Sequence, residues 1–209
     1  MTSPIDQFIS TFDKGLRTLS GNYAIQRTSP AANIEEPQLD ADQTKHAAGL
    51  MRVNHCGEIC AQALYEGQAL VAKSDAARKT LSQAAQEELD HLGWCKQRLQ
   101  ELNAKPSVLD PLFYVASFGM GALTGLAGDK ISLGFVEATE DQVVKHIDQH
   151  LKELPEEDQK SQAVLTQMSI DEASHGANAL QLGGTEFPTG LKQIMTVISK
   201  LMTKTTYQI

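Results

Sequence analysis

Hydrophobic residues recur along this chain every three or four positions, which is the spacing of amphipathic helices. The alternating pattern of half-buried β-strands is almost absent. We therefore predict an all-α fold. Helices are expected over residues 5–19, 44–73, 76–103, 130–153, 157–182 and 188–204, with a loop over residues 20–43. The first of them carries an apolar stripe made of Ile5, Phe8, Ile9, Phe12, Leu16 and Leu19.

An uncharged segment, "PLFYVASFGMGALTGLAG", separates the two halves of this pattern. It runs from Pro111 to Gly128, and its 18 residues are at the lower limit for a membrane span. Its four glycines and its place between long helices argue against a true span. Two alternatives stay open, a buried crossover and a crossover helix whose outer face enters lipid. Four long helices with a long central connection predict a ferritin-like four-helix bundle over residues 44–209, preceded by an amphipathic stretch and loop over residues 1–43.

The last helix is amphipathic and its only charges are Lys192, Lys200 and Lys204. A basic amphipathic helix on an acidic protein suits an anionic membrane surface. Packing on the bundle or on a second subunit is the alternative. Its apolar face consists of Leu191, Ile194, Met195, Ile198, Leu201 and Met202.

The charge and cysteine content narrow the class of protein. The formal net charge is -8 at pH 7, which argues against a general nucleic-acid-binding role. The three cysteines are odd in number and form no CxxC pair, so we expect a reducing compartment and neither a disulfide framework nor a thiolate zinc site. The N-terminal sequence lacks a basic segment followed by an apolar run, which argues against a signal or transit peptide.

Carboxylates interrupt the apolar stripes of all four long helices near mid-helix. Burying four carboxylates without partners would cost many kcal/mol. No lysine or arginine lies on those stripes at the same depth, so a pair of divalent or trivalent metal ions is the simplest source of positive charge. The residues concerned are Glu58 in the first long helix, Glu88 and His91 in the second, Glu140 in the third, and Glu172 and His175 in the fourth.

The order of these residues repeats. Glu58 is followed 30 residues later by the motif Glu88-x-x-His91. Glu140 is followed 32 residues later by the motif Glu172-x-x-His175. Di-iron and di-manganese carboxylate bundles use this ligand set. Hard oxygen ligands hold iron through changes of oxidation state, carboxylates bridge two metals, and one imidazole per metal leaves positions open for dioxygen. A buried histidine is also often a hydrogen-bonded core residue, so the prediction depends on the whole set.

Neighbouring acids are candidates for a supporting role. Glu87 and Asp171 each precede a ligand Glu, and we expect them to orient the histidines, with surface salt bridges as the alternative. Glu137 lies one turn before Glu140 and is its main rival as a ligand, and Asp141 is a weaker rival.

Several motifs resemble one family. "RVNHCGEICAQALYEGQAL", "EELDHLGWC", "VEATEDQVVKHIDQHL" and "DEASHGANAL" are similar to the demethoxyubiquinone hydroxylases of ubiquinone biosynthesis, and the resemblance runs from about residue 45 to 205. It implies a membrane-associated di-iron monooxygenase that hydroxylates the ring of a polyprenyl methoxy-methyl-benzoquinol before a final O-methylation. The implied metal ligands are the six that the stripes indicate: Glu58, Glu88, His91, Glu140, Glu172 and His175.

The resemblance also implies partners and a location. Two iron ions, the quinol and O₂ are expected, and the reductant is either NADH or the quinol itself, already reduced. His146 matches a family histidine that handles the quinone or the electrons, so we predict a catalytic role for it. The chain resembles the bacterial form and differs from animal members, which have Glu at position 141 and Tyr at position 147. We expect a peripheral protein on the cytoplasmic side of the cell membrane, as a homo-oligomer or in a complex with other ubiquinone-biosynthesis proteins.

Two other functions remain as alternatives. An iron-storage or ferroxidase bundle would assemble a shell and need no lipid contact. A di-manganese catalase would use a similar ligand set. Neither would act on a quinol, so a quinone profile separates them from the hydroxylase.

Overall fold

A computed structural model of the chain describes the backbone of residues 4–209 and all of their side chains except those of Pro4, Gln7 and Phe8. The predicted position of Phe8 on the first apolar stripe therefore lies outside the described side chains. The all-α prediction is confirmed over this part of the chain. Its helices are α1 (Pro4–Ser20), α2 (Ala41–Val71), α3 (Asp75–Glu101), α4 (Asp110–Ala127), α5 (Asp129–Glu153), α6 (Gln159–Gln181) and α7 (Thr189–Thr206).

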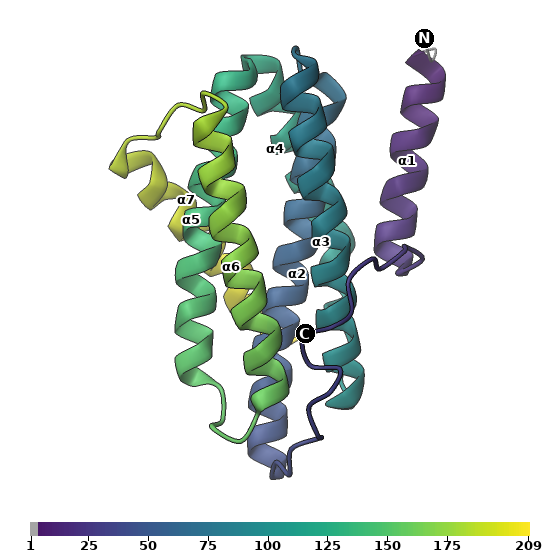
Figure 1. Cartoon of the computed structure of the whole chain (residues 1–209), viewed down its shortest axis with the longest axis vertical. Helices are drawn as coiled ribbons and strands as arrows, with labels where there is room; N and C mark the ends of the chain where they lie inside the picture. The colour runs from purple at the N-terminus through teal and green to yellow at the C-terminus, as the bar shows by residue number, and fades with distance from the viewer. Residues whose placement is uncertain (1–3) are drawn as a thin grey trace.

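Helices α2, α3, α5 and α6 run side by side and form the bundle (Figure 1). Within the bundle, α2 packs mainly on α3, and α5 packs mainly on α6, while the most extensive packing of α2 is on α4. Most predicted ends are within a few residues of the observed ones. Helix α2 begins at Ala41, three residues before the predicted start at about residue 44, because Asp40 and Gln43 form a capping box.

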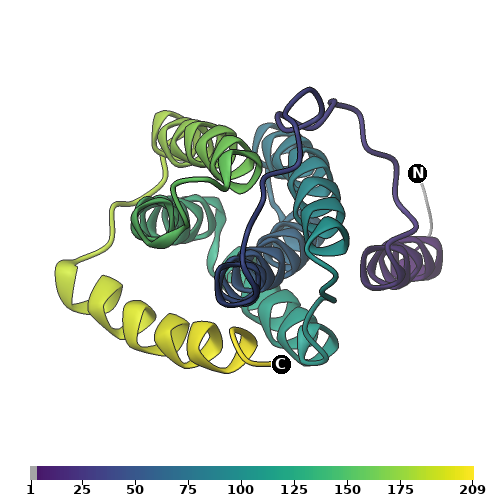
Figure 2. The same cartoon turned by 90° about the horizontal axis from the view of Figure 1, so that it is seen from below.

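Helix α4 is the crossover between the two halves and packs closely on α2 (Figure 2). A Cβ on Gly121 would meet the backbone of Leu64, and a Cβ on Gly67 would meet the backbone of Phe118, so only glycine allows this approach. The other face of α4 is exposed, which excludes a fully buried crossover. Among the described residues, no helix is long and apolar enough to cross a membrane. The exposed apolar residues of α4 are Leu112, Val115, Met120, Leu123 and Leu126.

Two buried apolar clusters lie at different heights along the bundle. One contains Met51, Cys95 and Met168, and the other contains Tyr65 and Leu81. On each helix the carboxylate singled out by the sequence falls between the residues of the two clusters. The polar middle of the bundle is thus enclosed by apolar side chains on both sides.

Helices α1 and α7 lie outside the bundle (Figure 2). Helix α7 contacts α2 and α5, where Lys192 pairs with Glu137 at 2.8 Å. The apolar face of α7 is largely exposed, as is the apolar stripe of α1. The exposed residues are Ile5, Ile9, Phe12 and Leu16 on α1, and Leu191, Ile194, Val197, Ile198 and Leu201 on α7.

Candidate metal centre

Helix geometry brings each Glu-x-x-His pair to one face. Residues three apart in a helix are neighbours on its surface. The Nδ1 atom of His91 lies 3.2 Å from Oε2 of Glu88 on α3. The Nδ1 atom of His175 lies 3.0 Å from Oε2 of Glu172 on α6. Both pairs are buried and point into the middle of the bundle.

The structure brings all six predicted ligands together in two overlapping groups. Glu58 and His91 belong to the first group, and Glu140 and His175 belong to the second. Glu88 and Glu172 belong to both groups. Within each group the candidate ligand atoms lie within 4.8 Å of one another. A carboxylate shared by two groups is placed to bridge two metal ions, so the glutamates of the two Glu-x-x-His motifs are the candidate bridges.

The burial of this cluster calls for positive charge. Glu58, Glu88, Glu140 and Glu172 are at most 2 % exposed. Among the described residues, one oxygen of each of these four carboxylates has no hydrogen-bond partner, although in Glu58, Glu88 and Glu172 that oxygen lies 3.0–3.4 Å from Nδ1 of a histidine. Four buried carboxylates that share two histidines are costly, and hard metal ions prefer such ligands. The residues present therefore fit a pair of metal ions.

Burial and neighbouring charges also shift the pKa values of three of these carboxylates. Burial, followed by repulsion from Glu88, raises the pKa of Glu58 well above its ordinary value. Burial and repulsion from Glu172 do the same to the pKa of Glu140. Burial also opposes ionisation of Glu88, but hydrogen bonds from the two histidines outweigh it and hold its pKa below the ordinary range. Without metal ions, Glu58 and Glu140 therefore tend to stay protonated, and metal binding would displace these protons.

The neighbouring carboxylates favour the protonated form of both histidines. Burial favours the neutral imidazole of His175, but its contacts with Glu172 and Glu88 raise its pKa to about 12. Glu172 and Asp171 raise the pKa of His91 well above its ordinary value against the same effect of burial. Because a metal ligand must be a neutral imidazole, metal binding would release these protons.

Each histidine contacts an acid from the opposite half of the chain. The Nε2 atom of His91 lies 2.9 Å from Oδ2 of Asp171, and the Nε2 atom of His175 lies 2.8 Å from Oε2 of Glu87. The other ring nitrogen, Nδ1, is left facing the carboxylate cluster in both cases. A carboxylate on the far nitrogen fixes the ring and its tautomer, which is how metal-binding histidines are held.

The sequence did not indicate two further residues of the site. Arg27, from the loop before α2, donates to Asp171 at 2.8 Å and to Asp90 at 2.9 Å, and its guanidinium stacks on Trp94. It has no helical spacing that could have revealed it. Tyr65 of α2 is fully buried and donates a hydrogen bond to Oε1 of Glu140. Its helical spacing does not distinguish it from the other buried residues of α2.

Comparison with known proteins gives a consistent result. The family model described as "Ubiquinone biosynthesis protein COQ7" matches residues 45–206. The chain belongs to this family. It is 57% identical over 210 aligned positions to a protein of Azotobacter vinelandii (strain DJ / ATCC BAA-1303) named "3-demethoxyubiquinol 3-hydroxylase", covering 99% of this chain and 97% of the relative. Proteins of the same name in Pseudomonas aeruginosa (strain LESB58) and Ectopseudomonas mendocina (strain ymp) are 54% and 55% identical, with the same coverage.

The COQ7 match includes all six clustered residues and begins after α1 and the loop that carries Arg27. The rival ligand Glu137 lies outside the two groups, since its carboxylate pairs with Lys192. Asp141 is also outside them and pairs with Lys145 at 2.7 Å.

His146 lies on α5 outside the two ligand groups. It lines a cavity between α2, α5 and α7 with a volume of about 510 Å³. Its ring centroid is 3.8 Å from that of His150, and burial lowers its pKa. The catalytic role of His146 stays a prediction.

Proposed function

We propose that the protein is a di-iron monooxygenase that hydroxylates the ring of 2-polyprenyl-3-methyl-6-methoxy-1,4-benzoquinol in ubiquinone biosynthesis. One observation carries the proposal. Six buried ligands form two overlapping groups, in a chain that matches proteins named 3-demethoxyubiquinol 3-hydroxylase over 99% of its length. The ligand chemistry and the names of the relatives point to the same reaction class.

The six residues have defined places in this proposal. Glu58 and His91 would hold one iron ion, Glu140 and His175 the other, and Glu88 and Glu172 would bridge them. Bound iron supplies the activation of O₂, which side chains cannot provide by themselves. The overall reaction consumes the quinol, O₂, two electrons and two protons, and yields the hydroxylated quinol and water. NADH is one proposed source of the electrons. The other is the quinol substrate itself, and in that case no further electrons or protons are consumed and the product is the hydroxylated quinone.

The protein's own residues prepare the centre for this chemistry. Asp171 and Glu87 orient the histidines, and Tyr65 fixes Glu140 through its hydroxyl. The two apolar clusters keep water from the middle of the bundle. A dry and rigid site strengthens electrostatic interactions and limits side reactions.

The substrate's polyprenyl tail supports a location at the membrane. We propose peripheral binding to the cytoplasmic side of the cell membrane through α4 and α7, which both pack on α2 and lie along one side of the bundle (Figure 2). Their exposed apolar residues and the exposed Lys200 and Lys204 suit an anionic lipid surface. Self-association and a complex with other ubiquinone-biosynthesis proteins stay predictions.

Replacement of Glu172 tests the function. Glu172→Ala removes a proposed bridge, so iron content should fall by at least about tenfold. A deletion strain that carries this variant should accumulate the demethoxy quinone. The control is Glu156→Ala, which makes the same change at an exposed position and should restore ubiquinone. Normal ubiquinone with Glu172→Ala would contradict the hydroxylase, and normal quinones in the deletion strain itself would favour the storage or catalase alternatives.

A further inference from the structure

Helix α7 turns its polar side toward the bundle and its apolar side outward. Leu201, on the outer side, is 69 % exposed. A surface helix of a globular protein normally has the reverse orientation, with its apolar stripe against the core. An apolar medium outside α7 would account for this orientation, in agreement with the proposed contact with lipid. The side that faces the bundle carries hydroxyl and ammonium groups at helical spacing: Thr196, Ser199, Lys200, Thr203 and Lys204.

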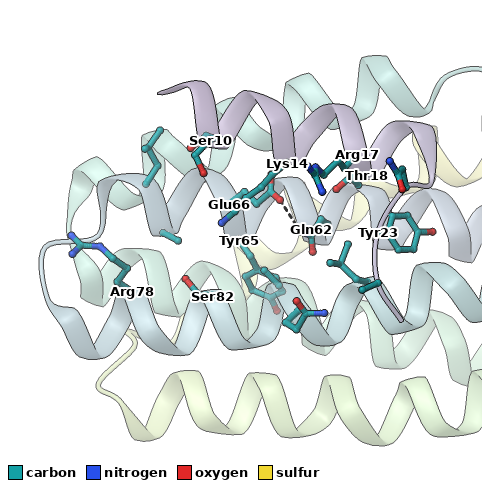
Figure 3. A pocket seen from close by; sticks show the side chains of 18 of the residues that line it. Ser10, Lys14, Arg17, Thr18, Tyr23, Gln62, Tyr65, Glu66, Arg78 and Ser82 are labelled. Carbon is teal, nitrogen blue, oxygen red and sulfur yellow. Dashed lines mark hydrogen bonds between the residues drawn. The ribbon is translucent and has the colours of Figure 1, made fainter. Parts of the chain in front are cut away.

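This polar stripe lines the α7 cavity, which lies between α2, α5 and α7 and has a volume of about 510 Å³. Ligand-binding pockets typically have volumes of about 300–1,000 Å³. The α7 cavity shares no lining residue with a larger cavity of about 950 Å³ between α1, α2 and α3, which Figure 3 shows from close by. The α7 cavity is therefore a separate candidate site, beside the helix that we propose to contact lipid.

The charge of the α7 cavity favours an anion. Lys145, Lys200 and Lys204 line it. Among the described residues that line it, Glu153 is the only acid, in a chain whose net charge is -8. Neither Lys200 nor Lys204 forms an ion pair with any described residue. Lys145 pairs with Asp141 at 2.7 Å, but this lysine is 71 % exposed, and exposed pairs contribute little.

Two histidines add polar groups to the walls of the α7 cavity. The Nε2 atom of His146 is buried, and among the described residues it has no hydrogen-bond partner. His150 is 5 % exposed, and Asn54 donates to its Nδ1 at 2.9 Å, so the neutral ring keeps its N–H on Nε2. Burial lowers the pKa of both imidazoles, so both are neutral near pH 7. A buried ring nitrogen without a partner is costly unless a ligand supplies one.

A phosphate group suits this combination of side chains. Ammonium groups attract its charge, and hydroxyl and imidazole N–H groups donate to its oxygens. The neighbouring apolar face of α7 suits acyl chains. When a basic amphipathic helix lies in a membrane surface, its apolar face enters the acyl region and its basic side chains stay at the level of the headgroups. The phosphate and the acyl chains of one phospholipid would therefore match two adjacent features of α7.

We propose that the α7 cavity binds the phosphate of an anionic phospholipid, with Lys200 and Lys204 facing the phosphate and His146 donating to it from Nε2. The inference rests on the proposed location at the membrane and deepens it. A pocket for one headgroup would fix the orientation of the protein on the membrane, which an apolar face by itself does not. Free phosphate shares the same chemistry, so the experiment includes it as a separate ligand.

A short-chain lipid tests the pocket without a bilayer. Dihexanoyl phosphatidylglycerol, kept below its micelle concentration, is titrated into the metal-loaded full-length protein by calorimetry, and binding should saturate. Ser199→Phe fills the cavity without changing a charge and should raise the Kd about tenfold or more. Ser199→Ala is the matched control, which leaves the cavity open and should bind like the unmodified protein. His146→Phe removes the ring nitrogens, should also weaken binding, and serves if Ser199→Phe displaces α7.

Inorganic phosphate distinguishes the two sources of the phosphate group. It is titrated into the same protein in the same way. It should bind about tenfold more weakly than the short-chain lipid or worse, because it has no acyl chains to bury on the outer face of α7. Equal or tighter binding of inorganic phosphate would overturn the lipid as the ligand.

Vesicles of phosphatidylcholine with phosphatidylglycerol test the same pocket at a membrane. Lys200→Gln with Lys204→Gln should weaken vesicle binding about tenfold or more and reduce its dependence on salt concentration. Lys79→Gln with Lys152→Gln makes the same change of charge at exposed positions outside the cavity and should have a small effect. Ser199→Phe should weaken vesicle binding at unchanged charge, which separates the pocket from general attraction to an anionic surface.

Two results would overturn the pocket. One is that the short-chain lipid shows no saturable binding, and the other is that it binds Ser199→Phe and His146→Phe as tightly as the unmodified protein. Failure of the membrane location would look different, because the short-chain lipid would bind while vesicles did not. Vesicle binding that is lost in Leu201→Asp but unchanged in Ser199→Phe would support the membrane location and count against the pocket alone.

Discussion

The Nε2 atom of His91 on α3 lies 2.9 Å from Oδ2 of Asp171 on α6, so the acid that orients this histidine comes from the other half of the chain. His175 and Glu87 form the reciprocal contact. Each acid directly precedes a candidate bridging glutamate. The two halves of the centre therefore position each other, and neither half is complete without its counterpart.

Neutralising these acids should weaken metal binding. Asp171→Asn and Glu87→Gln keep the side-chain shape but remove the charge that fixes each imidazole. We expect metal affinity to fall about 10–100-fold in each variant, measured by competition with a chelator. The effect should be larger at Asp171, because Arg27 also loses a partner there. Asp148→Asn is the exposed control, and equal affinity in all variants would exclude an orienting role.

Removing one hydroxyl from the cluster should destabilise the metal-free protein. Tyr65→Phe keeps the ring but deprives the buried Glu140 of its donor. An unsatisfied buried group of this kind costs about 1–3 kcal/mol in unfolding free energy. Urea unfolding measures it, with Tyr23→Phe as the same change outside the cluster. An unchanged midpoint would show that the hydroxyl contributes no net stability.

Acidification should destabilise the protein through His150. Its pKa is lowered to about 3, first by burial and then by His146 and His46, and its Nδ1 receives a hydrogen bond from Asn54 at 2.9 Å. The unfolded histidine takes up a proton near pH 6.5, so this stability is present above about pH 6.5 and is lost as the pH falls toward 3. The loss is up to about 1.4 kcal/mol per pH unit.

His150→Gln isolates this contribution. The glutamine retains an oxygen that can accept from Asn54 and does not titrate. Urea unfolding between neutral pH and about pH 5 should therefore give a smaller loss of unfolding free energy for the variant. Parallel curves for the two proteins would contradict the assignment, since every other titrating group is common to both.

The exposed face of α7 should govern lipid binding. Leu201 is 69 % exposed, and Leu201→Asp places a charge where an acyl chain would lie. Burial of a leucine side chain in lipid is worth about 1.5–3 kcal/mol, so its loss should reduce partitioning onto anionic vesicles about tenfold or more. Gln193→Asp adds the same charge at another exposed position of α7 and should have a small effect. Equal binding of the two variants, with unchanged iron content, would rule out α7 as the docking helix.

Met202 and Lys192 are less useful for that test than the sequence pattern suggested. The sequence pattern placed Met202 on the apolar face. In the structure its side chain is half-buried, and its sulfur accepts a hydrogen bond from the hydroxyl of Thr206. Lys192 belongs to the basic residues of the helix, but its ammonium group is committed to Glu137. Helical spacing assigns residues to a face and carries no information about which neighbouring element covers part of that face.

The sequence by itself determined the helical class and the six clustered residues. Periodicity of 3.6 residues is a local property, and a carboxylate such as Glu88 in an apolar stripe is visible from its immediate neighbours. The repeated order of Glu and Glu-x-x-His showed the two halves without any coordinates.

Only the tertiary structure decided which glutamates are shared and which acids support which histidine. Glu88 and Glu172 belong to both ligand groups, and Glu87 and Asp171 cross between the halves, because α3 and α6 face each other in the bundle. Arg27 reaches the site from an irregular loop. Such contacts join residues up to 144 positions apart, and their geometry depends on how the helices pack, which a local pattern does not contain.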